Sequence, residues 1–269
     1  MCRWLAYAGP PIFLDSLLLR PENSLARQSL SASESAHVVN ADGFGIGWYG
    51  EREHPGLFKD VLPAWNDVNL LNLSEQIKSH LFFGHVRATT GTAVNRTNCH
   101  PFRHGKWLFM HNGEIGGFEK VRRTLAFAVA PELYHLIQGT TDSEVFFHLM
   151  LTFGLEDDPE NAIRQAIRAI ENAQQEAGVD EPFNMTIALT DGQTIWAVRH
   201  ASKGRVPSLY VGVGAKPHDI SDTITVTTGT AVIILSEPLD DDVSQWTAID
   251  PDHMVVAGDG AISVTPFTL

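Results

Sequence analysis

The sequence predicts an α+β protein that folds as a single domain over residues 1–269. Apolar runs typical of β-strands lie near the N-terminus and again from residue 183 onward. Two helical patterns lie between them, one that begins near Thr141 and one over 159–177. No internal repeat, low-complexity tract or clear linker divides the chain, so we expect one folded unit.

Local patterns give the order of elements in the first half of the chain. A strand over 3–7 is expected to end in a turn at residues 9–11, and the helical segments after it are separated at Pro21. The polar stretch over 50–80 is expected to carry a helix near 73–80. Two further strands are expected, at 81–87 and 106–110.

Capping residues and alternation give the second half. Thr141 or Asp142 can cap the central helix, and Glu144 falls in its first turn. Past residue 183 the pattern changes to strands. They are expected at 185–189, 194–198, 209–214, 224–227, 232–235, 254–257 and 261–264.

Charge and composition exclude several classes of partner. The net charge is −13 and neither lysine nor arginine forms a run, so nucleic acid and anionic membranes are expected to be poor partners. No apolar run approaches the ~20 residues of a membrane span, and the N-terminus lacks the pattern of a signal peptide. Two cysteines, Cys2 and Cys99, make no disulfide framework. We therefore expect a cytoplasmic protein.

Glycine alternates with larger residues between Asp42 and Tyr49. In a strand, this spacing places all the glycines on one face, where another backbone or a ligand can approach closely. The same stretch superficially suggests a dinucleotide-binding loop, but the spacing is wrong and no helix follows. We therefore expect a strand with one open face.

Cys2 stands directly behind Met1, so that removal of one methionine would make it the N-terminal residue. The freed α-amine, with a pKa of about 7.7–8.0, would lie a few bonds from a thiol with a pKa of about 8.5. The amine could then act as the general base that raises the share of reactive thiolate. Taken alone, a cysteine at this position favours plain packing as a small apolar residue.

Three further elements have an ordinary interpretation when each is taken alone. Arg87 could form a surface ion pair, Asn112-Gly113 could be a common turn, and Asp142 could be only a helix cap. Together they supply what hydrolysis of a glutamine-like side chain requires. An amide and a backbone N–H stabilise an oxyanion, a guanidinium binds an α-carboxylate, and a carboxylate binds an α-ammonium group.

At these motifs the sequence resembles the class II glutamine amidotransferases, which are N-terminal-nucleophile (Ntn) hydrolases. The matching motifs agree in order and approximate spacing: Met1-Cys2-Arg3, 42–48, Gly84-His85-Val86-Arg87 with Thr90, 98–102, His111-Asn112-Gly113 and 141–144. Further similarity in Pro21 to Ser29 and in Ser236 to Leu239 points to a stand-alone branch. That branch includes YafJ-like proteins, the ergothioneine-pathway amidohydrolase and the fungal glutathione-degradation amidotransferase.

The resemblance implies a four-layer αββα sandwich of two antiparallel sheets, with Cys2 at the start of a central strand. It implies that Cys2 is the nucleophile, with its own amine as base, and that Asn112 and Gly113 form the oxyanion hole. The residues implied to bind substrate are Arg87, Thr90, His111 and Asp142. The loop over 88–95 would close over the substrate as a lid.

One departure from the family pattern concerns the size of the substrate. The better-known synthases carry an aromatic residue after the arginine, whereas this chain has Ala88, which suggests a more open lid or a substrate bulkier than glutamine. Cys99 is expected to be a packing residue. His85, His100 and His111 lack metal-ligand spacing, so we expect hydrogen-bonded structural histidines, no metal and no cofactor.

These features lead to a hypothesis of thiol-dependent hydrolysis of γ-glutamyl amides through a γ-glutamyl thioester, on a small-molecule substrate. The chain is expected to lack room for a synthetase domain. Two alternatives remain: a glutaminase subunit that delivers ammonia to a separate synthetase partner, and a non-catalytic glutamine-binding regulatory subunit. A homo-oligomer is compatible with each. The enzyme hypotheses require removal of Met1.

Overall fold

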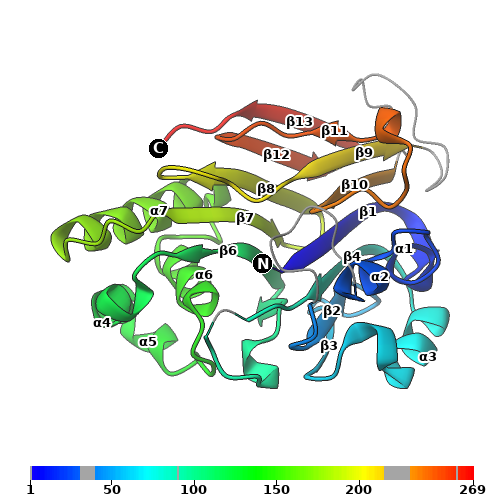
Figure 1. Ribbon diagram of the computed structural model, residues 1–269, viewed down its shortest axis with the longest axis horizontal. Coiled ribbons are helices and arrows are strands. Elements are labelled where there is room, and N and C mark those ends of the chain that lie inside the picture. The colour runs from blue at the N-terminus through cyan, green and yellow to red at the C-terminus, as the bar shows by residue number, and fades with distance from the viewer. Residues whose placement is uncertain (1, 31–39, 90, 215–230, 259) are drawn as a thin grey trace.

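A computed structural model describes residues 2–30, 40–89, 91–214, 231–258 and 260–269. Two β-sheets dominate it (Figure 1). One sheet has seven strands in the order β11-β9-β10-β1-β4-β2-β3, and the other has six in the order β13-β12-β8-β7-β6-β5. Every pairing within the described residues is antiparallel.

The bounds of the elements are as follows. The strands are β1 Arg3–Phe13, β2 Phe44–Trp48, β3 Gly56–Asp60, β4 Lys78–Val86, β5 Phe102–His104, β6 Trp107–Ile115, β7 Phe183–Thr190, β8 Thr194–Ala201, β9 Tyr210–Gly214, β10 Ala231–Leu235, β11 Thr247–Ala248, β12 His253–Gly258 and β13 Ala261–Pro266. The α-helices are α1 Asp15–Leu18, α2 Leu25–Leu30, α3 Val68–Gln76, α4 Phe118–Ala128, α5 Pro131–Tyr134, α6 Asp142–Thr152 and α7 Pro159–Glu176.

Three hydrophobic cores stack these elements into four layers. One core lies between the sheets and includes Trp4 of β1 and Met110 of β6. A second joins the outer face of the seven-stranded sheet to α1–α3, and a third joins the six-stranded sheet to α4, α6 and α7. Figure 1 shows the two groups of helices on opposite sides of the paired sheets. The expected α+β fold with a four-layer αββα sandwich is confirmed.

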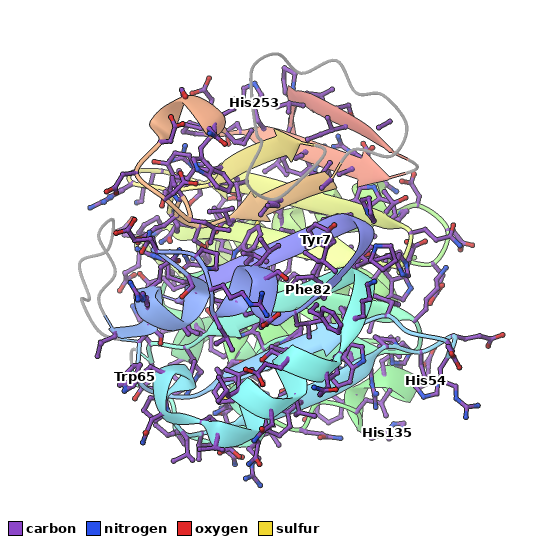
Figure 2. All side chains as sticks on the ribbon, turned by 90° about the vertical axis from the view of Figure 1, so that its right-hand side faces the viewer. Tyr7, His54, Trp65, Phe82, His135 and His253 are labelled. Atoms are coloured by element: carbon purple, nitrogen blue, oxygen red, sulfur yellow. The ribbon has the colours of Figure 1, made fainter. Side chains whose placement is uncertain are left out.

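Strand β1 occupies the middle of the seven-stranded sheet, between β10 and β4. Tyr7 of β1 and Phe82 of β4 pack with ring centroids 5.1 Å apart, and Figure 2 shows both in the interior of the molecule. The expected turn at residues 9–11 is wrong, because β1 continues to Phe13. The register with β4 shifts between Ala8 and Ile12, where the prolines interrupt regular pairing.

The glycines of β2 have the close neighbours that their alternation predicted. A side chain at Gly45 would collide with the carbonyl group of His100. At Gly47, an added Cβ would lie 2.8 Å from Leu108 and 3.0 Å from Pro101. The segment that crosses this face therefore needs glycine in β2, and the expected open face is confirmed.

Other expectations for the secondary structure need correction. The helix expected at 73–80 is α3, which starts at Val68 and ends at Gln76, and β4 already begins at Lys78. The side chain of Asp67 accepts a hydrogen bond from the N–H of Leu70 at 2.7 Å and so caps the helix earlier than expected. Helices α4 and α5 and strands β3, β5 and β11 were not predicted. The strand expected at 224–227 lies outside the described residues.

Among the described residues, no helix is both long and apolar enough to cross a bilayer.

A buried histidine joins β8 to two carboxylates. His200 Nδ1 lies 2.6 Å from Asp252 Oδ1, and Nε2 lies 3.4 Å from Glu171 Oε1 on α7. Burial opposes the charged imidazole, but the hydrogen bonds to Glu171 and Asp252 outweigh burial, and the pKa of His200 is raised. Its stabilising contribution is therefore complete below the unfolded value of about 6.5 and is lost as pH rises through the higher folded value.

We expect His200→Gln to lower the free energy of unfolding more at acidic than at alkaline pH. The extra loss at about pH 5.5 relative to about pH 8.5 should be about 0.5–1 kcal/mol, because the Asp252 side chain is 58% exposed and solvent screens the pair. Urea unfolding at the two pH values measures it. Asp252→Asn is a matched variant, since asparagine tolerates the backbone angle φ of 56° there. If the free energy of unfolding fell equally at both pH values, the charge of His200 would not be the source of its stabilising contribution.

Candidate active site

Cys2 lies just before β1, at the layer between the two sheets. Trp4 and Ala6 of β1 point into that layer, and alternation along the chain directs Cys2 to the same face. Its Sγ lies 3.6 Å from the carbonyl oxygen of Ala88, which follows β4. The thiol is therefore placed at the end of the central strand, beside the start of the loop over 88–95.

Asn112 belongs to β6, the strand that faces β1 across the layer between the sheets. Leu108 and Met110 point into that layer, so alternation directs Asn112 toward it too. The Asn112 side chain is fully buried, yet neither its Oδ1 nor its Nδ2 has a hydrogen-bond partner among the described residues. Burying an amide without a hydrogen-bond partner destabilises the folded protein, which indicates that Asn112 has a purpose other than stability.

Gly113 follows in the same strand with a φ of 150°, a conformation that favours glycine. A side chain there would collide with the carbonyl oxygen of Asn184 on the paired strand β7. The interpretation of Asn112-Gly113 as a turn is wrong, because both residues are paired in β6 with Thr186 and Met185. The side-chain amide of Asn112 and the backbone of Gly113 are therefore both held in place by the paired strand β6.

Arg87 is the residue after β4 and is 3% exposed, so it is not a surface ion pair. Its Nη2 donates to the hydroxyl groups of Thr92 at 2.5 Å and Thr89 at 3.3 Å, and Nη1 donates to the carbonyl oxygen of Asp42 at 3.3 Å. The carboxylate of Asp42 accepts from the N–H of Thr89 at 2.8 Å. The guanidinium therefore fastens the described part of the loop that was expected to form a lid.

Asp142 is the first residue of α6, which Thr141 caps through a hydrogen bond from the N–H of Glu144. Asp142 Oδ2 accepts from the N–H of Ile115 at 2.8 Å, which ties the helix to the end of β6. Asp142 is therefore not the cap but a link between α6 and β6. Burial raises the pKa of the Cys2 thiol, and the charge of Asp142 acts in the same direction with a smaller effect.

Ser143 links Asp142 to His111, a role that the sequence did not reveal. The Ser143 hydroxyl donates to Asp142 Oδ1 at 3.3 Å and lies 2.8 Å from His111 Nδ1. The His111 ring packs edge-on against Phe146 and Phe183, so it faces the helices instead of the layer between the sheets. Burial lowers the pKa of His111. Its part in substrate binding remains a prediction.

Burial raises the pKa of the Cys2 thiol, and the positive charge of Arg87 partly offsets this. A thiol with a raised pKa is mostly protonated at neutral pH. It reacts efficiently only if a neighbouring base takes the proton as the sulfur attacks. The electrostatics of the site therefore call for the base that a free α-amine of Cys2 would supply.

His85 and His100, the other two histidines singled out in the sequence, form a stack of uncharged rings next to β6. The rings of His85 and His100 lie 4.2 Å apart, and burial lowers the pKa of His85 to about 3. His85 Nε2 lies 3.3 Å from the carbonyl oxygen of His111. Neither ring nitrogen of His100 has a partner among the described residues, so the expectation of hydrogen-bonded histidines holds for His85 and fails for His100. No set of three metal-ligating side chains gathers within the described chain.

Of two other residues singled out in the sequence, Cys99 and Thr90, the structure places Cys99. Cys99 is fully buried, with Sγ 3.5 Å from the carbonyl oxygens of Asp60 and Asn95, as expected of a packing residue. Thr90 lies outside the described residues, so its predicted contact with substrate stays a prediction. Asn98 is a further contributor: its side chain bonds the carbonyl oxygen of Ala93 and the N–H of Thr140, which joins the loop to the segment before α6.

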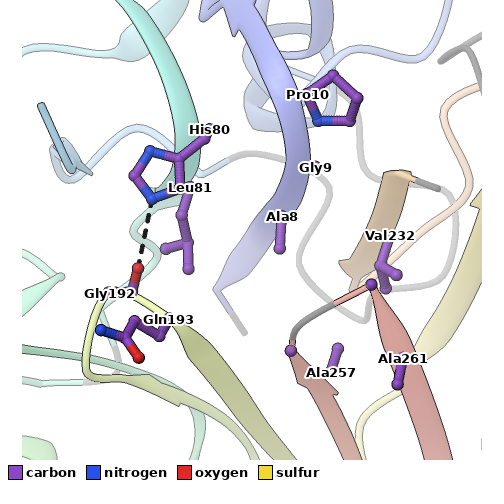
Figure 3. Close-up of a pocket in the computed structure, with 12 residues that line it drawn as sticks. Ala8, Gly9, Pro10, His80, Leu81, Gly192, Gln193, Val232, Ala257 and Ala261 are labelled. Atoms are coloured by element: carbon purple, nitrogen blue, oxygen red, sulfur yellow. Dashed lines mark hydrogen bonds between the residues drawn. The ribbon is translucent and has the colours of Figure 1, made fainter. Parts of the chain in front are cut away.

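A separate cavity of about 400 Å³ lies at the other end of β1 (Figure 3). Ala8, Gly9 and Pro10 line it together with His80 and Gln193. Six to eight residues of extended chain separate it from Cys2, a distance of about 20–26 Å. This cavity is therefore not the candidate active site.

Comparison with known proteins agrees with this arrangement. The family model of the class-II glutamine amidotransferases matches residues 22–268. A probable glutamine amidotransferase of Saccharomyces cerevisiae, DUG3, is 33% identical, over 99% of this chain and 84% of its own length. A γ-glutamyl-hercynylcysteine sulfoxide hydrolase of Mycolicibacterium smegmatis is 27% identical, over 99% of this chain and its full length.

Solved structures show the same fold. The structure of a glutamine aminotransferase class-II domain protein from Silicibacter pomeroyi has a TM-score of 0.76 and 34% identity, and the match covers 99% of this chain and 100% of that one. The glutamine phosphoribosylpyrophosphate amidotransferase from B. subtilis, at 16% identity, shares the fold with a TM-score of 0.58 over 99% of this chain and 49% of its own. The resemblance seen in the motifs is thereby confirmed: the chain belongs to the class-II glutamine amidotransferase family.

Proposed function

We propose that this protein hydrolyses a γ-glutamyl amide, with Cys2 as the nucleophile and residues 1–269 acting as one amidohydrolase domain. The observation that carries the proposal is the arrangement of two strands, β1 and β6, which face each other from different sheets. The central strand of one sheet directs Cys2, and the facing strand of the other directs the unpartnered amide of Asn112, into the same layer. A thiol opposite a preorganised amide donor is suited to attack on a carbonyl carbon.

The chemistry proceeds in two halves. After removal of Met1, the α-amine of Cys2 takes the thiol proton as Sγ bonds to the γ-carbonyl carbon. Asn112 Nδ2 and the N–H of Gly113 stabilise the resulting oxyanion. The C–N bond then breaks, the amine returns its proton to the leaving nitrogen, and a γ-glutamyl thioester remains. Water attacks the thioester with the amine as base, the C–S bond breaks, and glutamate leaves.

Two charged groups are suited to hold the glutamyl end of the substrate. Arg87 precedes Ala88, whose carbonyl oxygen lies 3.6 Å from Cys2 Sγ, and Asp142 is hydrogen-bonded to the end of β6, the strand that carries Asn112. A guanidinium pairs with the α-carboxylate and a carboxylate pairs with the α-ammonium group. We propose these roles for Arg87 and Asp142, with Thr90 and His111 as further contacts.

The group beyond the scissile bond is proposed to be larger than ammonia. The carbonyl oxygen of Ala88 lies 3.6 Å from Cys2 Sγ, and Ala88 has only a methyl side chain where the better-known synthases carry an aromatic residue. The relative from M. smegmatis is named as a hydrolase of a γ-glutamyl-cysteine derivative. We therefore favour a specific γ-glutamyl metabolite, in the cytoplasm, over delivery of ammonia to a synthetase partner.

A substrate panel tests the proposal. Intact-mass measurement first establishes that Met1 is absent, and the protein alone is then assayed with glutamine, γ-glutamyl amines and γ-glutamyl-cysteine derivatives. We expect kcat/KM for one γ-glutamyl compound to exceed that for glutamine by about tenfold or more, the value of one or two good side-chain contacts. Preference for glutamine would favour the synthetase-partner alternative. No turnover and no covalent labelling of Cys2 by a glutamine-derived electrophile would leave only a binding subunit.

A further inference from the structure

A buried ion pair lies directly beside Cys2. Arg3 is 1% exposed and Glu237 is fully buried, and Arg3 Nε donates to Glu237 Oε1. Arg3 is the first residue of β1, and Glu237 follows the neighbouring strand β10. Removing two charges from water costs several kcal/mol per ion, so such a pair is weak evidence for stability as its purpose.

The same guanidinium also holds the main chain of Cys2. Arg3 Nη1 donates to the carbonyl oxygen of Cys2 at 2.8 Å, while Nε is engaged with Glu237. A guanidinium is planar and its N–H groups have a fixed geometry. With one edge fixed by the carboxylate, the other fixes the direction of the Cys2 carbonyl group.

Glu237 is itself held from two sides. The hydroxyl of Ser236 accepts from the N–H of Trp4 at 3.1 Å, and the N–H of Ser236 donates to the carbonyl oxygen of Trp4 at 3.0 Å. From the helical layer, Gln28 Nε2 donates to the carbonyl oxygen of Glu237 at 3.2 Å. The segments Pro21 to Ser29 and Ser236 to Leu239, which the motif analysis singled out, therefore meet around Arg3.

We propose that Arg3 and Glu237 are positioning residues that aim Cys2 at Asn112, an inference that rests on the proposed function. Cys2 precedes the first paired residue of β1, and chain ends in that situation fray unless they are tied down. The hydrogen bond from Arg3 to the carbonyl oxygen of Cys2 holds this chain end, and Glu237 fixes the orientation of Arg3. Lysine cannot replace Arg3, because one ammonium group lacks the geometry to serve both partners.

The decisive variant is Arg3→Met combined with Glu237→Met. Replacing a buried ion pair with apolar side chains of similar size is often neutral for stability, so this variant should fold and melt near the wild-type temperature. It should nevertheless lose kcat by about tenfold to 100-fold, because small displacements of a reacting group have effects of that size. KM should stay within about threefold, since neither residue is placed to touch the substrate. Labelling of Cys2 by a glutamine-derived electrophile should slow in proportion to kcat.

Companion variants separate the possible outcomes. Arg3→Lys keeps the positive charge but lacks the fixed geometry of the guanidinium and should slow labelling in the folded protein, while Asp15→Asn, which removes another buried carboxylate, should not. Wild-type kcat in the double methionine variant would overturn the positioning role. Wild-type labelling in folded Arg3→Lys would overturn it if the double variant does not fold. Activity that survives Cys2→Ala would instead refute the proposed function.

Discussion

Cys2→Ala is expected to abolish hydrolysis of γ-glutamyl amides. Loss of the thiol removes the thioester route, and the rate should fall by about 10⁴-fold or more, to the level that binding and oxyanion stabilisation alone provide. Because the Cys2 side chain is small and only partly buried, the melting temperature should hardly change. Steady-state assays on the preferred substrate of the panel, with thermal melts of both proteins, measure the two effects.

Two controls make this result specific. Cys99→Ala removes the other thiol, which is buried and packs against carbonyl oxygens, and it should keep wild-type kcat at some cost in stability. Cys2 protein in which Met1 is deliberately retained should be as inactive as Cys2→Ala, because the α-amine is then part of an amide. Full activity with Met1 retained would refute the amine as base.

Asn112→Leu is expected to lower kcat by about 10²–10³-fold, which is the effect of removing one oxyanion donor. The opposite sign is expected for stability. The Asn112 amide is fully buried and makes no hydrogen bond to the described residues, so an apolar side chain of similar size should leave the melting temperature unchanged or raise it. Activity assays and thermal melts on the same preparation test both halves.

Thr186→Val is the matched control for this prediction. Thr186 pairs with Asn112 across β6 and β7 and is equally buried; the change exchanges its hydroxyl, which donates to the carbonyl oxygen of Asn112 at 3.5 Å, for a methyl group. It should keep kcat within about threefold, because it contributes no donor to the oxyanion. If Asn112→Leu instead lost stability and activity together, the amide would be assigned to packing of the strand.

Much of this site can be predicted from the sequence because its chemistry is local. The residue types of Cys2, Arg87, Asn112 and Asp142 can be seen along the chain, as can the places of Cys2, Arg87 and Asp142 at strand and helix ends, and Thr141 caps α6 as its residue type indicates. The alternation of apolar residues also determines which faces of β1 and β6 are buried. These features suffice to predict the α+β fold class, the family and the proposed nucleophile.

Only the tertiary structure decides which local preferences are overridden. Asn112-Gly113 favours a turn locally, but both residues pair with β7 in an extended strand. Gly9-Pro10-Pro11 likewise stays within β1, because the ladder is irregular there and demands no donor from proline.

The Met1-Cys2-Arg3 motif shows both contributions. The sequence determines that a thiol follows Met1 with an arginine after it. The partner that holds Arg3 is Glu237, 234 residues away, and no local pattern connects the two. Side chains so distant in sequence meet only because β1 and β10 pair in one sheet and bury both charges together. The sequence determines the chemical groups of this site, and long-range strand pairing determines how they lie relative to one another.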